Sequence, residues 1–296
     1  IGFEGGIVFY DSFLPDITAP KNYGRVSGYG YAMGYLGALA ILFLNMGFLS
    51  NGINIENISN IHHSFLLTGG FFLIFSLPVF FVVHEPKSQS TQSLSFYFLS
   101  GFKRVKSTLK NLRQYKNVGK FLLAFFLYND GILTVISFAS IIAVKTFNFT
   151  VQELIIFFIS VQSSAVIGSI FFGILTDKIG AKKTIITTLL LWLITVTLSY
   201  FSESKTDFYI IGFIVGVLLG ASQSASRSMM AILTPKNHEA EFFGFYDGFC
   251  GKASAIIGPV LFGLISSVMH NQKLAILSIG IFFLGGLILL KDVKSN

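Results

Sequence analysis

Long apolar stretches, separated by polar segments, dominate the pattern of this chain. Each holds about 20 mostly apolar residues, the length that an α-helix needs to cross a bilayer. Backbone polar groups in lipid must be satisfied within the segment, so the stretches are predicted to be helices. A partial stretch, Ile1–Leu14, is predicted to stop before Pro15. The eight complete ones are Val26–Leu49, Ser64–Val83, Phe121–Val144, Leu154–Thr176, Thr184–Phe201, Phe208–Leu233, Phe245–Met269 and Leu274–Leu290.

A short motif recurs in the two parts of the chain. Pro20-Lys21-Asn22 returns as Pro235-Lys236-Asn237, about 215 residues later. Each copy is followed by three glycines with the same internal spacing, Gly30, Gly34 and Gly37 in the first and Gly244, Gly248 and Gly251 in the second. A period of this size matches six membrane helices with their loops, as in transporters built from parallel repeats.

The repeat predicts how the chain is divided. Residues 1–83 form the remainder of an N-terminal membrane half, 84–120 a cytoplasmic linker, and 121–296 a C-terminal half. Pairing the two copies places Ile1–Leu14 at the end of a fourth helix, so the first three helices of a twelve-helix protein are expected to be missing. The predicted fold is an all-α membrane protein with two pseudo-symmetric six-helix halves, here reduced to about eight full helices and part of one.

Composition and charge agree with a membrane protein. The chain is 53% hydrophobic and 12% charged, whereas soluble domains carry about 25% charged residues. If the loop after Pro15 is cytoplasmic, every Lys and Arg except Lys145, Lys205 and Lys273 lies on that side. This asymmetry predicts a cytoplasmic C-terminus and accounts for the net charge of +7 without nucleic acid.

The linker contains apolar residues at helical spacing opposite a basic face. This pattern predicts a basic amphipathic helix on the inner leaflet, and a disordered basic linker is the alternative. The apolar positions are Phe98, Phe102, Val105, Leu109 and Leu112, and the basic ones are Lys103, Arg104, Lys106, Lys110 and Arg113.

The loop from Gly173 to Lys183 carries a recognisable motif, with Asp177-Lys178 followed by Gly180 and then Lys182-Lys183. It resembles the signature loop of the major facilitator superfamily. Other stretches are similar to the branch of that superfamily related to the fungal vacuolar amino-acid effluxer of autophagy. They are Phe9–Asp16, Gly24–Gly28, Gly34–Gly37, Tyr128–Gly131, Gln223–Ser228 and Glu239–Tyr246. The resemblance implies a twelve-helix alternating-access carrier, with amino-acid export reported for the fungal relatives.

Several polar residues within the predicted helices are candidates for solute or proton binding. Asp130 lies near the middle of its helix, where an ionisable group is costly and functional by default. A carboxyl group there can bind a proton in one state and release it in another, and a structural carboxylate bonded to a neighbouring helix is the alternative. The further candidates are Tyr128, Asn129, Glu4, Gln223 and Gln162.

A second group of charged residues is predicted to form a cytoplasmic gate. Arg227 shares a helix face with Gln223 and can pair with Asp177, Asp247, Glu239 or Glu241. The rival role for Arg227 is to anchor a solute carboxylate or phosphate through its planar guanidinium. The predicted gate comprises Asp177, Lys178, Lys182, Lys183, Arg227, Asp247 and Lys252.

Small residues predict where helices approach closely. Gly30, Gly34 and Gly37 form one such face, and Ser164 with Gly168 forms another. The resemblance implies that these two helices meet across the halves and slide there during transport; close packing without motion is the alternative.

The sequence therefore predicts a secondary active transporter that moves a small polar metabolite, with an amino acid as the best single guess. Its predicted partners are the solute, protons and the lipid bilayer, and it is expected to be a monomer in a bacterial inner membrane. No cofactor or metal is expected, because the histidines lie at helix ends and Cys250 is the single cysteine. A membrane sensor or scaffold that has lost transport is the alternative function.

Overall fold

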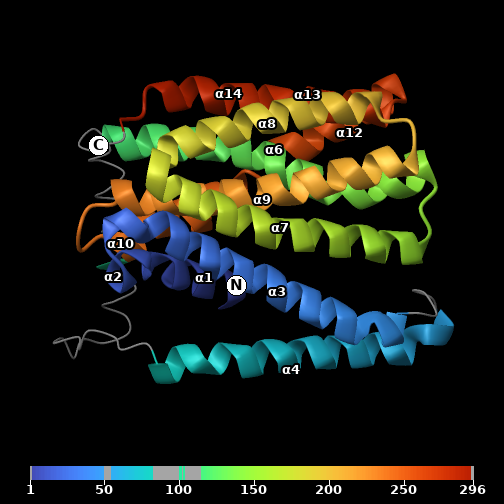
Figure 1. Cartoon of the computed structure of the whole chain (residues 1–296), viewed down its shortest axis with the longest axis horizontal. Helices are drawn as coiled ribbons and strands as arrows, with labels where there is room; N and C mark the ends of the chain where they lie inside the picture. Colours follow the sequence, from blue (N-terminus) through green and yellow to red (C-terminus); the bar gives the residue numbers. More distant parts are fainter. Residues whose placement is uncertain (1, 50–54, 83–99, 102, 104–114, 295–296) are drawn as a thin grey trace. The chain divides into compact units, whose positions relative to one another are not determined.

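The computed structural model describes residues 2–49, 55–82, 100–101, 103 and 115–294, without the side chains of Phe3 and Glu4. The described residues form helices joined by short turns, with no strand among them (Figure 1). The helices are α1 (Gly2–Ser12), α2 (Leu14–Ile17), η1 (Pro20–Asn22), α3 (Tyr23–Leu49), η2 (Ile55–Asn57), α4 (Ile58–Val82), α6 (Lys116–Phe147), α7 (Val151–Ile179), α8 (Ala181–Phe201), α9 (Lys205–Leu233), α10 (Glu239–Phe243), the π-helix η3 (Gly244–Cys250), α11 (Gly251–Ala253), α12 (Ile257–Met269), α13 (Gln272–Ser278) and α14 (Gly280–Lys291).

The described part of the chain contains eight helical segments that are long and apolar enough to cross a membrane. Each overlaps one of the eight stretches predicted from the sequence, so the all-α membrane fold is confirmed. The predicted basic amphipathic helix around Phe98–Arg113 falls almost wholly outside the described residues. The division at residues 84 and 120 stays a prediction.

The chain separates into two compact units, of which the larger comprises Ile1–Leu36 and Leu112–Asn296 and the smaller Gly37–Asn111. Within the smaller unit, the end of α3 and α4 are joined by few polar contacts. The amide Nδ2 of Asn45 donates to Thr68 Oγ1 at 3.2 Å, and the ring of Phe48 stacks on His63. The larger unit contains the residues discussed from here on.

Close backbone contact between α7 and α9 organises the larger unit, where the two helices run side by side (Figure 1). A Cβ atom added to Gly168 on α7 would lie 2.7 Å from the Cα atom of Val217 on α9. On α9, Gly216 and Gly220 are packed just as tightly against α7. Both helices begin with a capping box, Thr150 with Glu153 and Ser204 with Asp207, which satisfies the first backbone amides.

Of the predicted glycine face on α3, Gly30 packs closely against the side chain of Arg227, whereas Gly34 and Gly37 make no close contact. A Cβ atom on Gly34 would meet nothing within 4 Å, and one on Gly37 would make only an ordinary contact at 4.0 Å. Instead, Gly24 and Gly28 lie against α7, where an added Cβ on Gly28 would approach Gly173 Cα to 3.1 Å. Helices α3 and α7 therefore do meet at small residues, but at Gly24 and Gly28 rather than at Gly30 and Gly34, and Gly168 faces α9 rather than α3.

One predicted helix is interrupted. The stretch Phe245–Met269 is not one continuous helix, because a π-helix and a turn at Ser254–Ile256 separate α10 from α12. The first helix, α1, ends at Ser12, before Pro15 as predicted, and Pro15 lies in the first turn of the separate helix α2, where its missing N–H group costs no hydrogen bond. Apolar length predicts that a segment spans the membrane, but it does not reveal an interruption that side chains from other helices stabilise.

We predict that Gly168→Ala destabilises the protein, because the added methyl group must displace the backbone of α9. The apparent melting temperature in detergent should fall by several degrees, corresponding to ~1–3 kcal/mol. The matched control is Gly34→Ala, which has open space around it and should leave the melting temperature unchanged or slightly higher. Equal effects of the two substitutions would contradict the assigned packing.

Candidate functional site

A buried ion pair lies at the centre of the site. Arg227 on α9 donates from Nη1 to Oδ1 of Asp11 on α1 at 2.6 Å. The two side chains are 5% and 4% exposed, so water screens the pair little. A buried pair is stable only when its remaining donors and acceptors are also satisfied.

The remaining contacts of Arg227 come from α3 and from Tyr10 on α1. Its Nε donates to Ser27 Oγ at 2.9 Å, and Nη2 donates to the Ser27 carbonyl at 2.7 Å. The ring of Tyr31 lies 4.3 Å from the guanidinium carbon and that of Tyr10 lies 5.6 Å away. Aromatic faces at this range attract a cation. Gly30 is required here, since a Cβ atom would lie 2.8 Å from Nη2.

A second acidic group adjoins this pair. Asp247 in the π-helix η3 interacts directly with the side chain of Asp11 and electrostatically with Arg227 and Lys252. Its Oδ2 atom is buried and has no hydrogen-bond partner among the described residues. A π-helix changes the direction of the side chains that follow it, and such segments are frequent at functional sites.

A separate carboxylate joins α7 to the start of α3. Asp177 accepts hydrogen bonds from the backbone amides of Gly24 at 2.7 Å and Arg25 at 3.2 Å. It also forms an ion pair with Arg25 Nε at 2.6 Å. A negative charge at the first turn of a helix is stabilised by the free amides and the helix dipole.

Serines on α9 complete the contact with α3. Ser27 Oγ donates to the Ser224 carbonyl at 2.9 Å, and Ser224 and Ser228 donate to carbonyls of Gly24 and Tyr23. These short side chains satisfy backbone acceptors while they allow the helices to approach closely. The polar surface of α9 thus holds α3 in place around Arg227.

The predicted partners of Arg227 need correction. Its ion-pair partner is Asp11, and Asp177 pairs with Arg25 instead. Glu241 accepts from the His238 ring, and Glu239 accepts from the Asn237 amide. Of the predicted gate, Asp247 is the one residue whose interaction with Arg227 is found in the described structure.

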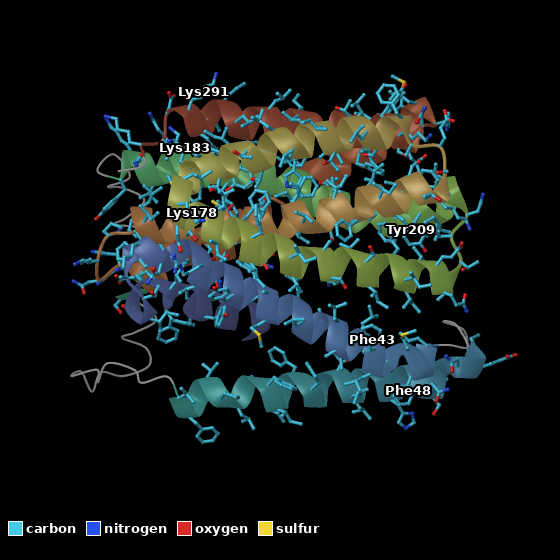
Figure 2. All side chains as sticks on the ribbon, in the orientation of Figure 1. Phe43, Phe48, Lys178, Lys183, Tyr209 and Lys291 are labelled. Carbon is cyan, nitrogen blue, oxygen red and sulfur yellow. The ribbon has the colours of Figure 1, made fainter. Side chains whose placement is uncertain are left out.

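Of the predicted gate lysines, Lys252 acts electrostatically on Asp247, and the contacts found for Lys182 lie elsewhere. Lys182 donates to the carbonyls of Lys291 and Val293 at 2.9 and 2.6 Å, which ties the end of the chain to α8. Lys178, Lys183 and Lys252 are exposed. Figure 2 shows Lys178, Lys183 and Lys291 at one end of the larger unit and Tyr209 at the other.

The three neighbouring candidates on α6 point to different places. Tyr128 hydrogen-bonds to Ser226 Oγ on α9 at 2.7 Å, and Asn129 donates to Ser254 Oγ at 2.7 Å. Asp130 is fully buried, and its Oδ1 accepts from the backbone amide of Gly258 at 2.9 Å. They therefore link α6 to two helices and do not form a single binding site.

The other candidates are distributed as follows. Gln223 accepts a hydrogen bond from the Tyr35 hydroxyl, one turn from Arg227. Gln162 lines a mostly apolar cavity of about 150 Å³ between α6, α7, α8 and α9, with Trp192 and Phe157 in its wall. The side chain of Glu4 lies outside the described part. The described residues hold no group of three His, Cys, Asp or Glu that could bind a metal.

Asp11 and Ser27 are functional candidates that sequence reasoning missed. A signal for Asp11 was present, because Asp11 and Arg227 stand at nearly the same distance before the two Pro-Lys-Asn tripeptides. Residues at equivalent positions of two parallel repeats can meet at the axis that relates them. No pattern pointed to Ser27, whose role depends on the close approach of α3 to α9.

Comparison with known proteins places this architecture in a family. Residues 1–296 match the model of the family described as vacuole effluxer Atg22 like. The chain is 32% identical to an uncharacterized MFS-type transporter of Bacillus subtilis, YxiO, over its whole length and 69% of that protein. It is 25% identical to autophagy-related protein 22 of Kluyveromyces lactis, covering 84% of the chain and 54% of that protein. The chain thus spans about half the length of such fungal relatives.

A solved structure shares the fold. The major facilitator superfamily transporter FucP, in an outward conformation, superposes with a TM-score of 0.72 over 98% of this chain and 72% of FucP. The identity is 15%, so this likeness concerns the fold alone. From the match of the whole chain and from this fold, the chain belongs to the Atg22-like family of the major facilitator superfamily and is a multi-pass membrane transporter.

Proposed function

We propose that the protein is a secondary active transporter that moves a small polar metabolite by alternating access, driven by a proton gradient. The observation that carries the proposal is the buried Arg227–Asp11 pair with its tyrosines and serines. A charge pair of this kind inside a membrane bundle is costly to maintain and marks a solute or ion pathway by default. Amino acids are the first class of solute to test, because the chain matches the Atg22-like family and the resemblance to the fungal effluxers implies amino-acid export.

Two polar contacts support the gate as the role of this region. Asp177 holds the start of α3 on α7, and Arg227 holds α1 and α3 on α9. If residues 1–83 and 121–296 belong to opposite halves, as the repeat predicts, both contacts cross between the halves. Rocking of one half against the other would then break both contacts.

The orientation and location are part of the same proposal. The exposed lysines at one end of the larger unit (Figure 2) support a cytoplasmic side there, with the C-terminus on it. The Bacillus relative supports the plasma membrane of a bacterium. We propose a monomer, because the site is assembled from helices of one chain.

Arg227→Lys should abolish most transport. Lysine keeps the positive charge but loses the planar fork that contacts Asp11 and Ser27 together. Counterflow of labelled amino acids in liposomes should fall by about tenfold or more, since disrupting a buried pair costs ~3–5 kcal/mol. Lys183→Ala, at an exposed lysine, is the control and should transport normally. A purified wild type that binds solutes without any flux would favour the sensor or scaffold instead.

Asp177→Asn should loosen the contact between α3 and α7. One carboxylate oxygen becomes an NH₂ group, which cannot accept from Arg25, and the charge at the helix start is lost. Cys250, the single cysteine, is 7% exposed and lies in η3, the segment that also carries Asp247, so we expect its accessibility to rise if the gate as a whole loosens. Its alkylation by N-ethylmaleimide should be roughly twofold to fivefold faster in the variant, as fits a partly exposed ion pair. Lys183→Ala again serves as control, and an unchanged rate in Asp177→Asn would argue against a gate here.

A further inference from the structure

Helix α12 begins inside the larger unit, and Asp130 occupies its first turn from the neighbouring helix α6. The chain turns at Ser254–Ile256, so the first amides of α12 have no partner within their own helix. Oδ1 of Asp130 accepts from one of them, the amide of Gly258, at 2.9 Å. Asp130 therefore caps a helix to which it does not belong.

The fit between Asp130 and Gly258 is close. A Cβ atom on Gly258 would lie 2.7 Å from Asp130 Oδ1 and 3.1 Å from the Asp130 carbonyl oxygen. Thr134 Oγ1 donates to that same carbonyl at 2.6 Å. Glycine at position 258 is thus what allows the first turn of α12 to reach the carboxyl group.

The second carboxyl oxygen of Asp130 is unused. Its side chain is 0% exposed, and Oδ2 has no hydrogen-bond partner among the described residues. A buried carboxylate without a cation is costly, and it becomes neutral when it takes up a proton. Oδ2 is the atom on which that proton can reside while Oδ1 keeps its bond to Gly258.

No charged side chain of the described residues compensates Asp130. The groups that act on it are the backbone amides of Ile257 and Gly258. In the same broken segment, Asp247 interacts with Asp11, Arg227 and Lys252. The hydroxyl of Tyr128, the nearest titratable group on α6, is directed to Ser226 on α9. The helix start alone stabilises the ionised form of Asp130.

We propose that Asp130 is the site that binds the coupling proton, at Oδ2, and that its charge determines how firmly the first turn of α12 is held. This inference rests on the proposed function and names the residue for its proton. When Asp130 is ionised, the carboxylate is a strong cap for α12. When the proton binds, an O–H bond forms at Oδ2, the charge disappears, and the cap weakens. Proton binding at Asp130 thereby changes the stability of the first turn of α12, next to the interruption between α11 and α12.

The test is amide hydrogen exchange of the peptide that covers the first turn of α12, measured on the purified protein at several pH values. Protection factors, corrected for the intrinsic pH dependence of exchange, should fall by about fivefold as the pH is lowered in the wild type. In Asp130→Asn the protection should not change with pH, because the amide oxygen still accepts from Gly258 but no proton is exchanged. Ser254→Ala, which removes the contact with Asn129 at the same turn, should keep the wild-type pH response.

A second variant tests the same contact from the side of α12. Gly258→Ala retains Asp130 but pushes the helix start away from it, so the pH response should disappear although the acid remains. A pH response that persists in Asp130→Asn or in Gly258→Ala would overturn the proposal, and so would its loss in Ser254→Ala.

Transport assays then distinguish this inference from the proposed function. Asp130→Asn should lose accumulation driven by a pH gradient and retain counterflow of labelled amino acids. If Asp130→Asn accumulates solute as well as the wild type does, Asp130 is not the proton-binding site, and the proposed transport function is unaffected. A wild type with the expected exchange response but no flux of any solute would refute transport and leave the protonation site intact.

Discussion

The insertion of one guanidinium group between α1, α3 and α9 is the constraint on which the described site depends. Arg227 reaches Asp11, the Ser27 hydroxyl and the Ser27 carbonyl together. Burial of such a charge costs several kcal/mol unless its donors are satisfied. The three helices must therefore lie at fixed distances, and a shift of any one of them would leave a buried charge without partners. This makes the contact suitable for holding one state of a carrier closed.

The close approach of the helices is what allows this contact. Gly24 and Gly28 lie against Gly173, and Gly168 lies against α9. In lipid, apolar side chains gain little by leaving the solvent, so association depends on close van der Waals contact and on hydrogen bonds. The glycines allow the close van der Waals contact, and Ser27, Ser224 and Ser228 form the hydrogen bonds. Small residues and the buried ion pair are thus parts of one arrangement.

The segment that contributes Asp247 to the site has an irregular backbone. The segment between Glu239 and Met269 passes through a π-helix and a turn before it resumes as α12. Non-helical backbone at membrane depth is tolerated where side chains of the protein satisfy it. Asp130 caps the resumed helix, and Asn129 bonds to Ser254 in the turn. Two adjacent residues of α6 therefore stabilise the interruption, and the rest of α6 is a regular helix.

The sequence by itself determined the number of spans, their type and the family. Apolar length and the need to satisfy the backbone in lipid allow only one solution for such stretches. It also indicated Asp130 and Arg227, because a charge within an apolar run is conspicuous. Only the tertiary structure decided which partners these charges have. Asp11 contacts Arg227 across 216 residues of chain, and Gly258 contacts Asp130 across 128. Local sequence patterns indicate the secondary structure of a segment and whether it spans the membrane. The partner of a buried charge depends instead on which helices pack closely enough around it to exclude water.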